Sequence, residues 1–304
     1  MTEKTIEQLN KDFGISGQVE VVEGKGGFPV VEISNAKATA KISVYAAQVL
    51  SFQPVGEPAD LMFVSENAYY KTGKATKGGI PICWPWFGPD PESQGRASHG
   101  FVRNRMWTLL SVEALPSGDT KVRFGMSPSE DTLAIWPYQF DLVLEVLVGD
   151  SLTVTLITEN KDDKSFSMTQ AFHTYFTTGD ISQVKVLGLD GKNYIDKPDG
   201  GAEKAQTGEL MVTAEVDRIY QDVPSELTIE DGDLGRRIRI STSGSSTAIV
   251  WNPWMEIAEK MADLATQDYQ RFICVETANA ADEVIEVAPG TSYVLKATYA
   301  IERD

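Results

Sequence analysis

Only two histidines occur among the 304 residues, His99 and His173, and both are candidates for work on a ligand. His173 lies at the end of an expected strand, in the apolar run Ala171–Phe176, where a lone histidine is more often a core residue than a catalyst. Imidazole is nevertheless the side chain best suited to donate and accept protons near neutrality. His99 is followed by a glycine and flanked by arginines, which suits a hydrogen-bond donor to an anionic or hydroxyl-rich ligand.

Two carboxylates stand where a base or a ligand-binding group could be used. Glu276 ends the apolar run Phe272–Glu276, so it either faces water at the rim of the fold or is held in a pocket. A pocket would raise the pKa of the Glu276 carboxyl and make it a usable base. Asp217 precedes Arg218, and a plain surface ion pair between these two residues is the alternative to a role in binding.

The stretch Lys77–Arg105 is unusually rich in glycine, proline, tryptophan and basic residues. Proline and glycine interrupt it too often for a helix, so it is expected to be an ordered loop, where binding groups concentrate. The alternative is a plug that closes one end of the core. From position 71 to 105, six basic residues stand against Asp90 and Glu92, which gives a net charge of +4. Either a solvated basic face or a cationic pocket for an anion would explain this cluster.

Tryptophans near these groups offer flat apolar faces of the kind on which sugar rings stack. They form two pairs, Trp84 with Trp86 and Trp251 with Trp254.

Metal and nucleophile chemistry have weaker support in the sequence. His99, His173 and Glu276 could meet as a facial triad for a metal ion, but two histidines at unrelated positions form no zinc motif. The chain has no Gly-x-Ser-x-Gly elbow, and neither Cys83 nor Cys274 has a histidine beside it. The two cysteines lie far apart in apolar surroundings, which indicates no disulfide framework and favours a reducing cytoplasm.

Composition narrows the function classes further. The net charge of −17 at pH 7 argues for solubility and against a general role on nucleic acid or an anionic membrane. Hydrophobic residues make up 42% of the chain, enough for a substantial core. We find neither a signal peptide nor an apolar run approaching the ~20 residues of a membrane span. We therefore expect a cytoplasmic protein with no nucleic-acid or membrane partner.

The segments around these groups have the pattern of a β protein. Lys37–Tyr45 alternates polar and apolar residues, and a period of two marks a half-buried strand. Tyr138–Val148 and Ser151–Glu159 flank Gly149-Asp150, which predicts a hairpin. We expect further strands at Val19–Glu23, Val30–Ile33, Gln48–Gln53, Leu61–Val64, Met106–Val112, Lys121–Met126, Phe166–Phe176, Gln183–Leu187, Leu227–Ile229, Arg237–Thr242, Ala248–Trp251, Phe272–Glu276 and Ser292–Ile301.

Helical patterns are confined to Met1–Phe13, Ser129–Ala134 and Met255–Thr266. Many short strands with glycine turns and few helices predict an all-β, antiparallel sandwich. We find no linker, so we expect a single domain over residues 1–304, with residues 1–15 either a peripheral helix or flexible.

Several motifs occur together, in the order typical of one enzyme family. They are Ala47–Phe52, Gly78–Pro89, His99–Asn104, Phe172–Phe176, Thr213–Tyr220, Trp251–Pro253 and Cys274–Thr277. This set covers roughly residues 30 to 300, and through it the chain resembles the bacterial glucose-6-phosphate 1-epimerases, or hexose-6-phosphate mutarotases, of the aldose 1-epimerase superfamily. The resemblance implies a galactose-mutarotase-like antiparallel β-supersandwich with a site on one face that uses no cofactor and no metal.

The resemblance also implies roles for individual residues. The histidine of the His-Thr-Tyr-Phe motif, His173, would be the general acid, and the glutamate of the Cys-Val-Glu motif, Glu276, the general base. His99 and Asp217 would bind sugar hydroxyls, and Arg103 would bind phosphate. Further candidates are Lys77 and Arg96 for the phosphate, and Gln48, within the first matching stretch, for the substrate.

One position departs from the family pattern. The family usually reads Arg-Gly-Gly-Ile-Pro, and this chain has Lys77 in place of that arginine. A lysine keeps the positive charge but loses the planar fork that suits phosphate oxygens. The epimerase chemistry is therefore better supported than the preference for a phosphorylated sugar.

The expected activity is the cofactor-independent interconversion of the α and β anomers of a hexose 6-phosphate, D-glucose 6-phosphate first, by a monomeric enzyme. Its small-molecule partner would be the sugar phosphate alone. Three alternatives stay open: an epimerase of a non-phosphorylated or another phosphorylated aldose, a non-catalytic carbohydrate-binding sandwich, and a metal-dependent sugar isomerase or oxygenase.

Overall fold

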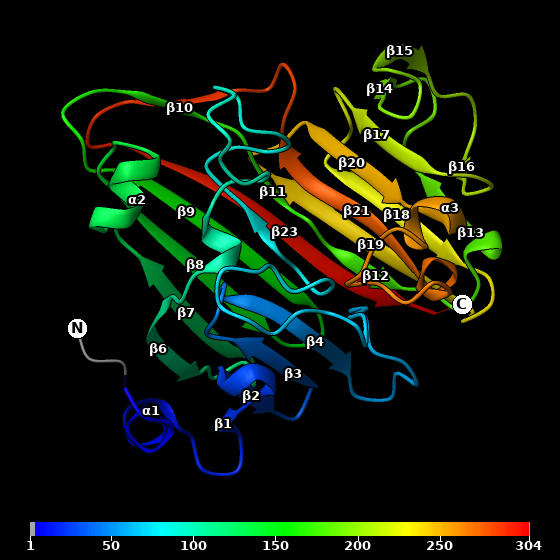
Figure 1. Cartoon of the computed structure of the whole chain (residues 1–304). Helices are drawn as coiled ribbons and strands as arrows, with labels where there is room; N and C mark the ends of the chain where they lie inside the picture. The colour runs from blue at the N-terminus through cyan, green and yellow to red at the C-terminus, as the bar shows by residue number, and fades with distance from the viewer. Residues whose placement is uncertain (1–3, 304) are drawn as a thin grey trace.

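The computed structural model describes residues 4–303, and its sheets are built of antiparallel strand pairs (Figure 1). Two large sheets carry most of the chain, and their facing sides share the largest hydrophobic cluster. The prediction of an all-β antiparallel sandwich is therefore confirmed.

The larger sheet has nine strands in the order β16-β13-β18-β19-β23-β9-β8-β7-β6. Buried and half-exposed residues alternate strictly along β8 and β9, so this sheet turns one face to the core. Its strands are β6 (Thr108–Ala114), β7 (Thr120–Met126), β8 (Phe140–Val148), β9 (Leu152–Asn160), β13 (Val184–Leu187), β16 (Leu210–Met211), β18 (Glu226–Asp231), β19 (Arg236–Ser243) and β23 (Ser292–Glu302).

The second sheet has eight strands in the order β15-β14-β17-β20-β21-β11-β5, with β12 also paired to β21. They are β5 (Ile82–Cys83), β11 (Gln170–Phe172), β12 (Tyr175–Thr177), β14 (Asn193–Asp196), β15 (Ala202–Ala205), β17 (Val216–Tyr220), β20 (Thr247–Asn252) and β21 (Phe272–Asn279).

Strand β21 is buried along its whole length, so both of its faces are covered. Ile273 and Val275 pack in the main core, whereas Cys274 belongs to a separate cluster with Tyr175. Successive residues of a strand point to opposite faces. Glu276 therefore shares the face of Cys274 and points away from the main core.

The remaining elements frame these two sheets. The four-stranded sheet, blue in Figure 1, lies at the opposite end of the view from β14 and β15. No helix among residues 4–303 is long and apolar enough to cross a membrane. The remaining bounds are β1 (Val19–Glu23), β2 (Pro29–Ser34), β3 (Ala38–Ser43), β4 (Gln48–Pro54), β10 (Phe166–Met168), β22 (Ile285–Val287), α1 (Ile6–Phe13), α2 (Glu130–Ile135), α3 (Trp254–Ala258), and the 3₁₀ turns η1 (Lys25–Gly27), η2 (Val102–Asn104), η3 (Ile181–Gln183) and η4 (Asp268–Arg271).

Three expected elements differ from the structure. The helix expected over Met255–Thr266 is wrong beyond Ala258, because from Lys260 onward the backbone N–H groups that donate do so three residues back, as in turns. The strand expected over Phe166–Phe176 is divided into β10, β11 and β12, because β10 pairs with β22 and the other two with β21. Leu61–Val64 makes only isolated bridges. For the expected helix Met1–Phe13, residues 1–3 lie outside the described part of the chain.

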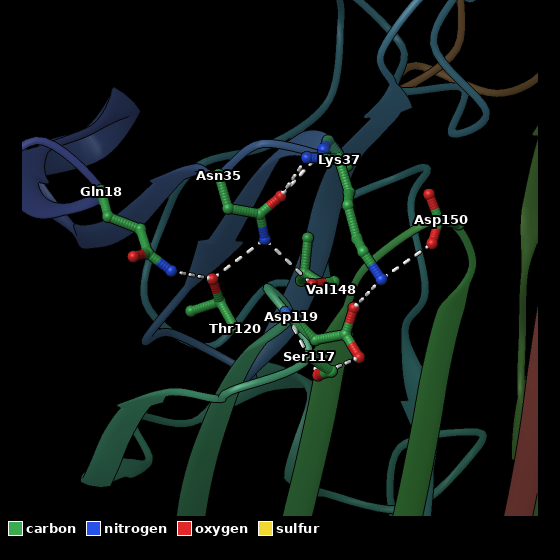
Figure 2. A network of polar contacts seen from close by, with 9 residues as sticks. Gln18, Asn35, Lys37, Ser117, Asp119, Thr120, Val148 and Asp150 are labelled. Carbon is green, nitrogen blue, oxygen red and sulfur yellow. Dashed lines mark hydrogen bonds and ion pairs between the residues drawn. The ribbon is translucent and has the colours of Figure 1, made fainter.

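A polar network joins the turn between β2 and β3 to the nine-stranded sheet (Figure 2). The Asn35 amide donates to Thr120 Oγ1 and to Val148 O, both at 3.0 Å. Gln18 donates to the same Thr120 hydroxyl at 2.7 Å, and Lys37 pairs with Asp119 at 3.0 Å. These contacts fix the position of the four-stranded sheet.

We expect Asn35→Ala to lower the free energy of unfolding by about 1–3 kcal/mol, because Val148 O and the backbone N–H groups of Lys37 and Ala38 all lose a hydrogen bond to this side chain. Urea denaturation measures this loss. Asn193→Ala is the control, because the Asn193 side chain is exposed. Equal stability of the two variants would contradict a bracing role for Asn35.

Candidate active site

A cavity of about 650 Å³ lies on the face of the eight-stranded sheet that points away from the main core. The strand register places Ile195, Ile219, Ile249 and Glu276 side by side across β14, β17, β20 and β21. All four residues line the cavity. The floor of the site is therefore an apolar row that ends in one carboxyl group.

A second row lies two residues further along the same strands and so on the same face. It places Asp217 opposite Trp251, with Lys197 just beyond the end of β14, and all three line the cavity. The backbone N–H of Lys197 donates to Asp217 O at 2.9 Å. The second row therefore brings a carboxyl group, an ammonium group and an aromatic face together.

His173 lies in the break between β11 and β12, beside Glu276. Its backbone N–H donates to Pro81 O at 2.9 Å, and its ring stacks on the Tyr175 ring with a centroid distance of 4.9 Å. The Nδ1 atom is 3.4 Å from Glu276 Oε1. The strand break thus brings an imidazole and a carboxyl group into contact at the cavity floor.

Burial governs the protonation of this pair, because His173 is 9% exposed and Glu276 only 2%. Burial lowers the pKa of His173 well below its usual value, and the charges of Arg103 and Lys77 lower it further. Burial also raises the pKa of Glu276 well above its usual value, and the Asp217 charge adds to that rise. Burial therefore favours the neutral forms of both groups over an imidazolium beside a carboxylate.

His99 is held by the loop before it. Its backbone adopts a φ of 63°, and its N–H donates to Gly88 O at 2.7 Å, while the Gly88 N–H donates to its Nδ1 at 3.2 Å. Burial first, then Arg103 and Lys77, lower its pKa to about 3. The imidazole is therefore neutral and carries its hydrogen on Nε2, which makes it a donor toward the cavity.

Asp217 is a further polar group around the cavity floor. Burial raises the pKa of its carboxyl group, although Lys197 opposes that shift. This carboxyl group can accept hydrogen bonds from hydroxyl groups of a ligand.

Three cationic side chains line the cavity, and they differ in the hydrogen-bond and ion-pair partners that they have. Arg103 donates to Ser98 O at 3.2 Å, and no carboxylate among residues 4–303 lies within ion-pair distance of it. Lys77 lies 3.6 Å from Asp263 Oδ2 and 5.8 Å from the centre of the Trp251 ring. Arg103 is thus better placed than Lys77 to receive an anion.

Lys197 is the third cation, and its acidic neighbours are already engaged. Both Asp196 and Asp199 pair with Lys204 at 2.7 Å. Lys197 is exposed, and among the described residues it has no ion-pair partner. Its charge is therefore available to a ligand in the cavity.

The cavity brings together six of the residues singled out in the sequence, namely Lys77, His99, Arg103, His173, Asp217 and Glu276. Two others do not line it. Gln48 is buried and donates to Gly78 O at 2.6 Å and to Thr76 O at 3.1 Å. Arg96 donates from Nε to Asp90 Oδ1 at 2.8 Å and from Nη1 to Ile135 O at 3.0 Å. The expected ligand roles of both are therefore corrected, because their polar groups already brace the loops around the site.

Of the tryptophans, Trp251 alone lines the cavity. Trp84 is fully buried in the main core, where its Nε1 donates to Met168 Sδ at 3.2 Å, and Trp86 lies in the same cluster. The expectation that the Trp84 and Trp86 faces would stack on a sugar is therefore wrong.

Sequence reasoning missed Lys197 and gave Tyr175 no role. The strands β14 and β17 are absent from the expected elements, so nothing placed Lys197 beside Asp217. The facial triad that the sequence left open as an alternative is also not formed. Among the residues that the structure describes, no three His, Cys, Asp or Glu side chains are arranged to hold one metal ion. In particular, His99 Nδ1 accepts a hydrogen bond from the Gly88 N–H.

Comparisons with known proteins place this site in a family context. The family model described as aldose 1-epimerase matches residues 29–300. A protein of Cenchrus ciliaris named "putative glucose-6-phosphate 1-epimerase" is 35% identical over 90% of this chain and 85% of its own length. A protein of Escherichia coli K12 with the same name is 34% identical over 83% of this chain and 84% of its own length.

Solved structures agree with these relatives. The crystal structure of a "putative mutarotase" from Salmonella typhimurium superposes with a TM-score of 0.89 at 30% identity and covers 96% of both chains. A galactose mutarotase-like protein of Clostridium acetobutylicum, 14% identical, superposes with a TM-score of 0.74 over 97% of this chain and all of its own. The expected galactose-mutarotase-like fold is confirmed.

Proposed function

The chain belongs to the aldose 1-epimerase family, and from this premise we propose that it interconverts the α and β anomers of a hexose 6-phosphate, D-glucose 6-phosphate first, without a cofactor. Membership makes it an epimerase, so the alternative of a non-catalytic carbohydrate-binding sandwich does not hold. The observation that carries the proposal is the contact of His173 with Glu276, 3.4 Å apart at the floor of a cavity. The names of the relatives support the phosphorylated substrate.

Anomer exchange requires two proton carriers near one carbon atom. The C1 hydroxyl and the ring oxygen are both attached to C1, so groups in mutual contact can reach both from one edge of the sugar. In the ring-opening direction Glu276 takes the proton of the C1 hydroxyl and His173 gives a proton to the ring oxygen, so the C1–ring oxygen bond breaks. After rotation about C1–C2, the two groups reverse roles and the ring closes on the other face. Each positioned proton transfer contributes about 10²–10⁴-fold.

Other groups around the floor bind the sugar. The neutral His99 donates from Nε2, Asp217 accepts from hydroxyl groups, and the Trp251 face packs against the ring. His99→Asn is expected to raise KM more than it lowers kcat, because this hydrogen bond exists before and after ring opening. Steady-state kinetics separate the two effects. A loss confined to kcat would show that His99 takes part in proton transfer instead.

Arg103 binds the phosphate, with Lys77 and Lys197 adding charge. The guanidinium fork suits phosphate oxygens better than an ammonium group does. Lys77 is the weaker member because Asp263 already faces it. This contact favours a second candidate substrate within the same family, a non-phosphorylated aldose.

Relative exchange rates decide between the two substrates. We expect D-glucose 6-phosphate to exceed free glucose in kcat/KM, with galactose 6-phosphate and mannose 6-phosphate measured beside them by NMR. Lys77→Arg is expected to lower KM for the phosphorylated sugars only. If free glucose is as good a substrate as its 6-phosphate, the cavity cations do not serve a phosphate group.

The pH dependence of kcat/KM follows from the single proton that the pair holds. At low pH a second proton binds to the pair, and neither group can then act as the base. At high pH the shared proton is lost, and neither group can then act as the acid, so the profile is bell-shaped. Burial lowers the pKa of His173 from 6.5, which moves the acid limb below that pH, and raises the pKa of Glu276 from 4.5, which moves the alkaline limb upward. We expect a broad plateau through neutrality. Rates that fall as the pH drops from 8 to 7 would contradict this order.

A further inference from the structure

Tyr175 lines the cavity beside His173, and both its backbone and its ring are held in place. Its backbone pairs with Cys274 of β21 on one side, and on the other its N–H donates to Gly79 O at 2.9 Å. Its ring lies parallel to the His173 imidazole, with an interplanar angle of 9°. The same ring meets Trp251 edge to face, with 5.9 Å between the centroids. Tyr175 is therefore fixed next to the acid–base pair.

The phenolic hydroxyl of Tyr175 has no partner in the described part of the chain. Tyr175 is only 3% exposed, yet its hydroxyl makes no hydrogen bond to any of residues 4–303. This oxygen is also not one of the polar atoms of those residues that are fully enclosed without a partner. Because Tyr175 lines the cavity, the small surface that the hydroxyl keeps opens into the cavity.

Other buried tyrosines of residues 4–303 show that this arrangement is unusual. Those buried at least as deeply all have hydrogen-bond partners at 2.8 Å, and the pairs are Tyr45 with Lys74, Tyr220 with Gln206, and Tyr299 with Thr174. A buried tyrosine hydroxyl usually finds such a partner, because an unpaired polar group costs stability. The unpaired hydroxyl of Tyr175 therefore points to a partner that enters the cavity from outside.

The chemistry of the hydroxyl limits what that partner can be. Burial raises the pKa of Tyr175 well above its usual value of 10.0, so the hydroxyl stays neutral and keeps a hydrogen to donate. Hydroxyl, ring and phosphate oxygens of a sugar phosphate all accept hydrogen bonds. In the proposed function His173 gives its proton to the ring oxygen of the sugar. A substrate in that position brings several acceptor oxygens close to Tyr175.

We propose that Tyr175 is a substrate-binding residue, whose hydroxyl donates a hydrogen bond to an oxygen atom of the bound sugar phosphate. This inference rests on the proposed function. The hydroxyl is unpaired in the free protein and gains its partner only in the complex, so stability is given up for affinity. The accepting oxygen belongs to the sugar or to its phosphate group, and the size of the effect distinguishes the two.

The first test is Tyr175→Phe, which keeps the ring and removes only the hydroxyl. We expect KM for D-glucose 6-phosphate to rise by about 2–10-fold if the acceptor is a sugar oxygen, and by about 10–100-fold if it is a charged phosphate oxygen. Exchange NMR at increasing substrate concentration measures KM. With free glucose, KM rises only if the acceptor lies on the sugar. An unchanged KM for both substrates overturns the proposal.

Thermal stability separates a ligand-binding hydroxyl from a structural one. The Tm of Tyr175→Phe is expected to equal or exceed that of the wild type, because the change removes a buried polar group that has no partner. Tyr45→Phe is the matched control, because the Tyr45 hydroxyl donates to Lys74 O and the residue does not line the cavity. This control should lower Tm and leave KM unchanged. A Tyr175→Phe variant that behaves in the same way overturns the proposal.

The wild-type enzyme in the same experiment shows which conclusion fails. If it exchanges the anomers of glucose 6-phosphate while Tyr175→Phe keeps the wild-type KM, Tyr175 is not a ligand and the proposed function stands. If the wild-type enzyme does not exchange them at all, the proposed function fails and this inference fails with it.

Discussion

Replacing His173 by Asn, or Glu276 by Gln, is expected to lower kcat for glucose 6-phosphate anomer exchange by about 10²–10⁴-fold. Each variant removes one proton carrier from a pair whose members lie 3.4 Å apart and keeps a side chain of similar size. The double variant should be little worse than either single variant, because one carrier without the other cannot complete the exchange. Exchange spectroscopy at equilibrium measures all three rates.

The control for the carboxyl change is Glu286→Gln on β22, where the side chain is exposed and lies outside the cavity. Circular dichroism checks that the active-site variants stay folded. Wild-type exchange rates in both single variants would show that the proton carriers lie elsewhere.

Replacing Gly100 by Ala is expected to lower kcat/KM by at least about tenfold and to lower Tm. Gly100 has a φ of +72°, and a Cβ there would lie 1.8 Å from Trp84 O, so the backbone beside His99 must move. A displacement of about 1 Å in a ligand-positioning group can cost about 10²-fold in rate.

Gly95→Ala is the matched control from the same loop. Gly95 has a φ of +81°, but a Cβ there would have open space around it. Its cost is therefore that of the left-handed backbone alone, about 1–2 kcal/mol, without displacement of His99. Equal losses of activity in the two variants would mean that the close approach to Trp84 does not position the site.

Local sequence patterns predict much of this fold because many strands bury one face. The alternation along β8 and β9 repeats every two residues, and the Gly149-Asp150 turn sets their register. Strands β14 and β17 were missed, since β14 pairs locally only with the short β15 and joins the rest of the sheet through β17, whose other partner is β20. Helix α3 ends early because the segment after Ala258 turns back, and Leu264 packs beside Tyr175 and Phe272.

The residues of the site, like the strands, were only partly predictable from local sequence. The motifs around His173 and Glu276 predict two residues of the cavity, and the strand register explains why they meet. Arg96 could not be excluded from the sequence, because its Asp90 partner lies only six residues away in a loop that could have turned either way. Lys197 could not be found, because only the folded sheet shows that Lys204 takes up its acidic neighbours.

The most direct test of the proposed chemistry is two-dimensional exchange NMR on D-glucose 6-phosphate at anomeric equilibrium, with wild-type enzyme, with Glu276→Gln and without enzyme. We expect cross-peaks between the α and β anomeric protons that grow with wild-type concentration and fall to the enzyme-free level in the variant. Cross-peaks of equal intensity in all three samples would contradict anomer exchange by the His173–Glu276 pair.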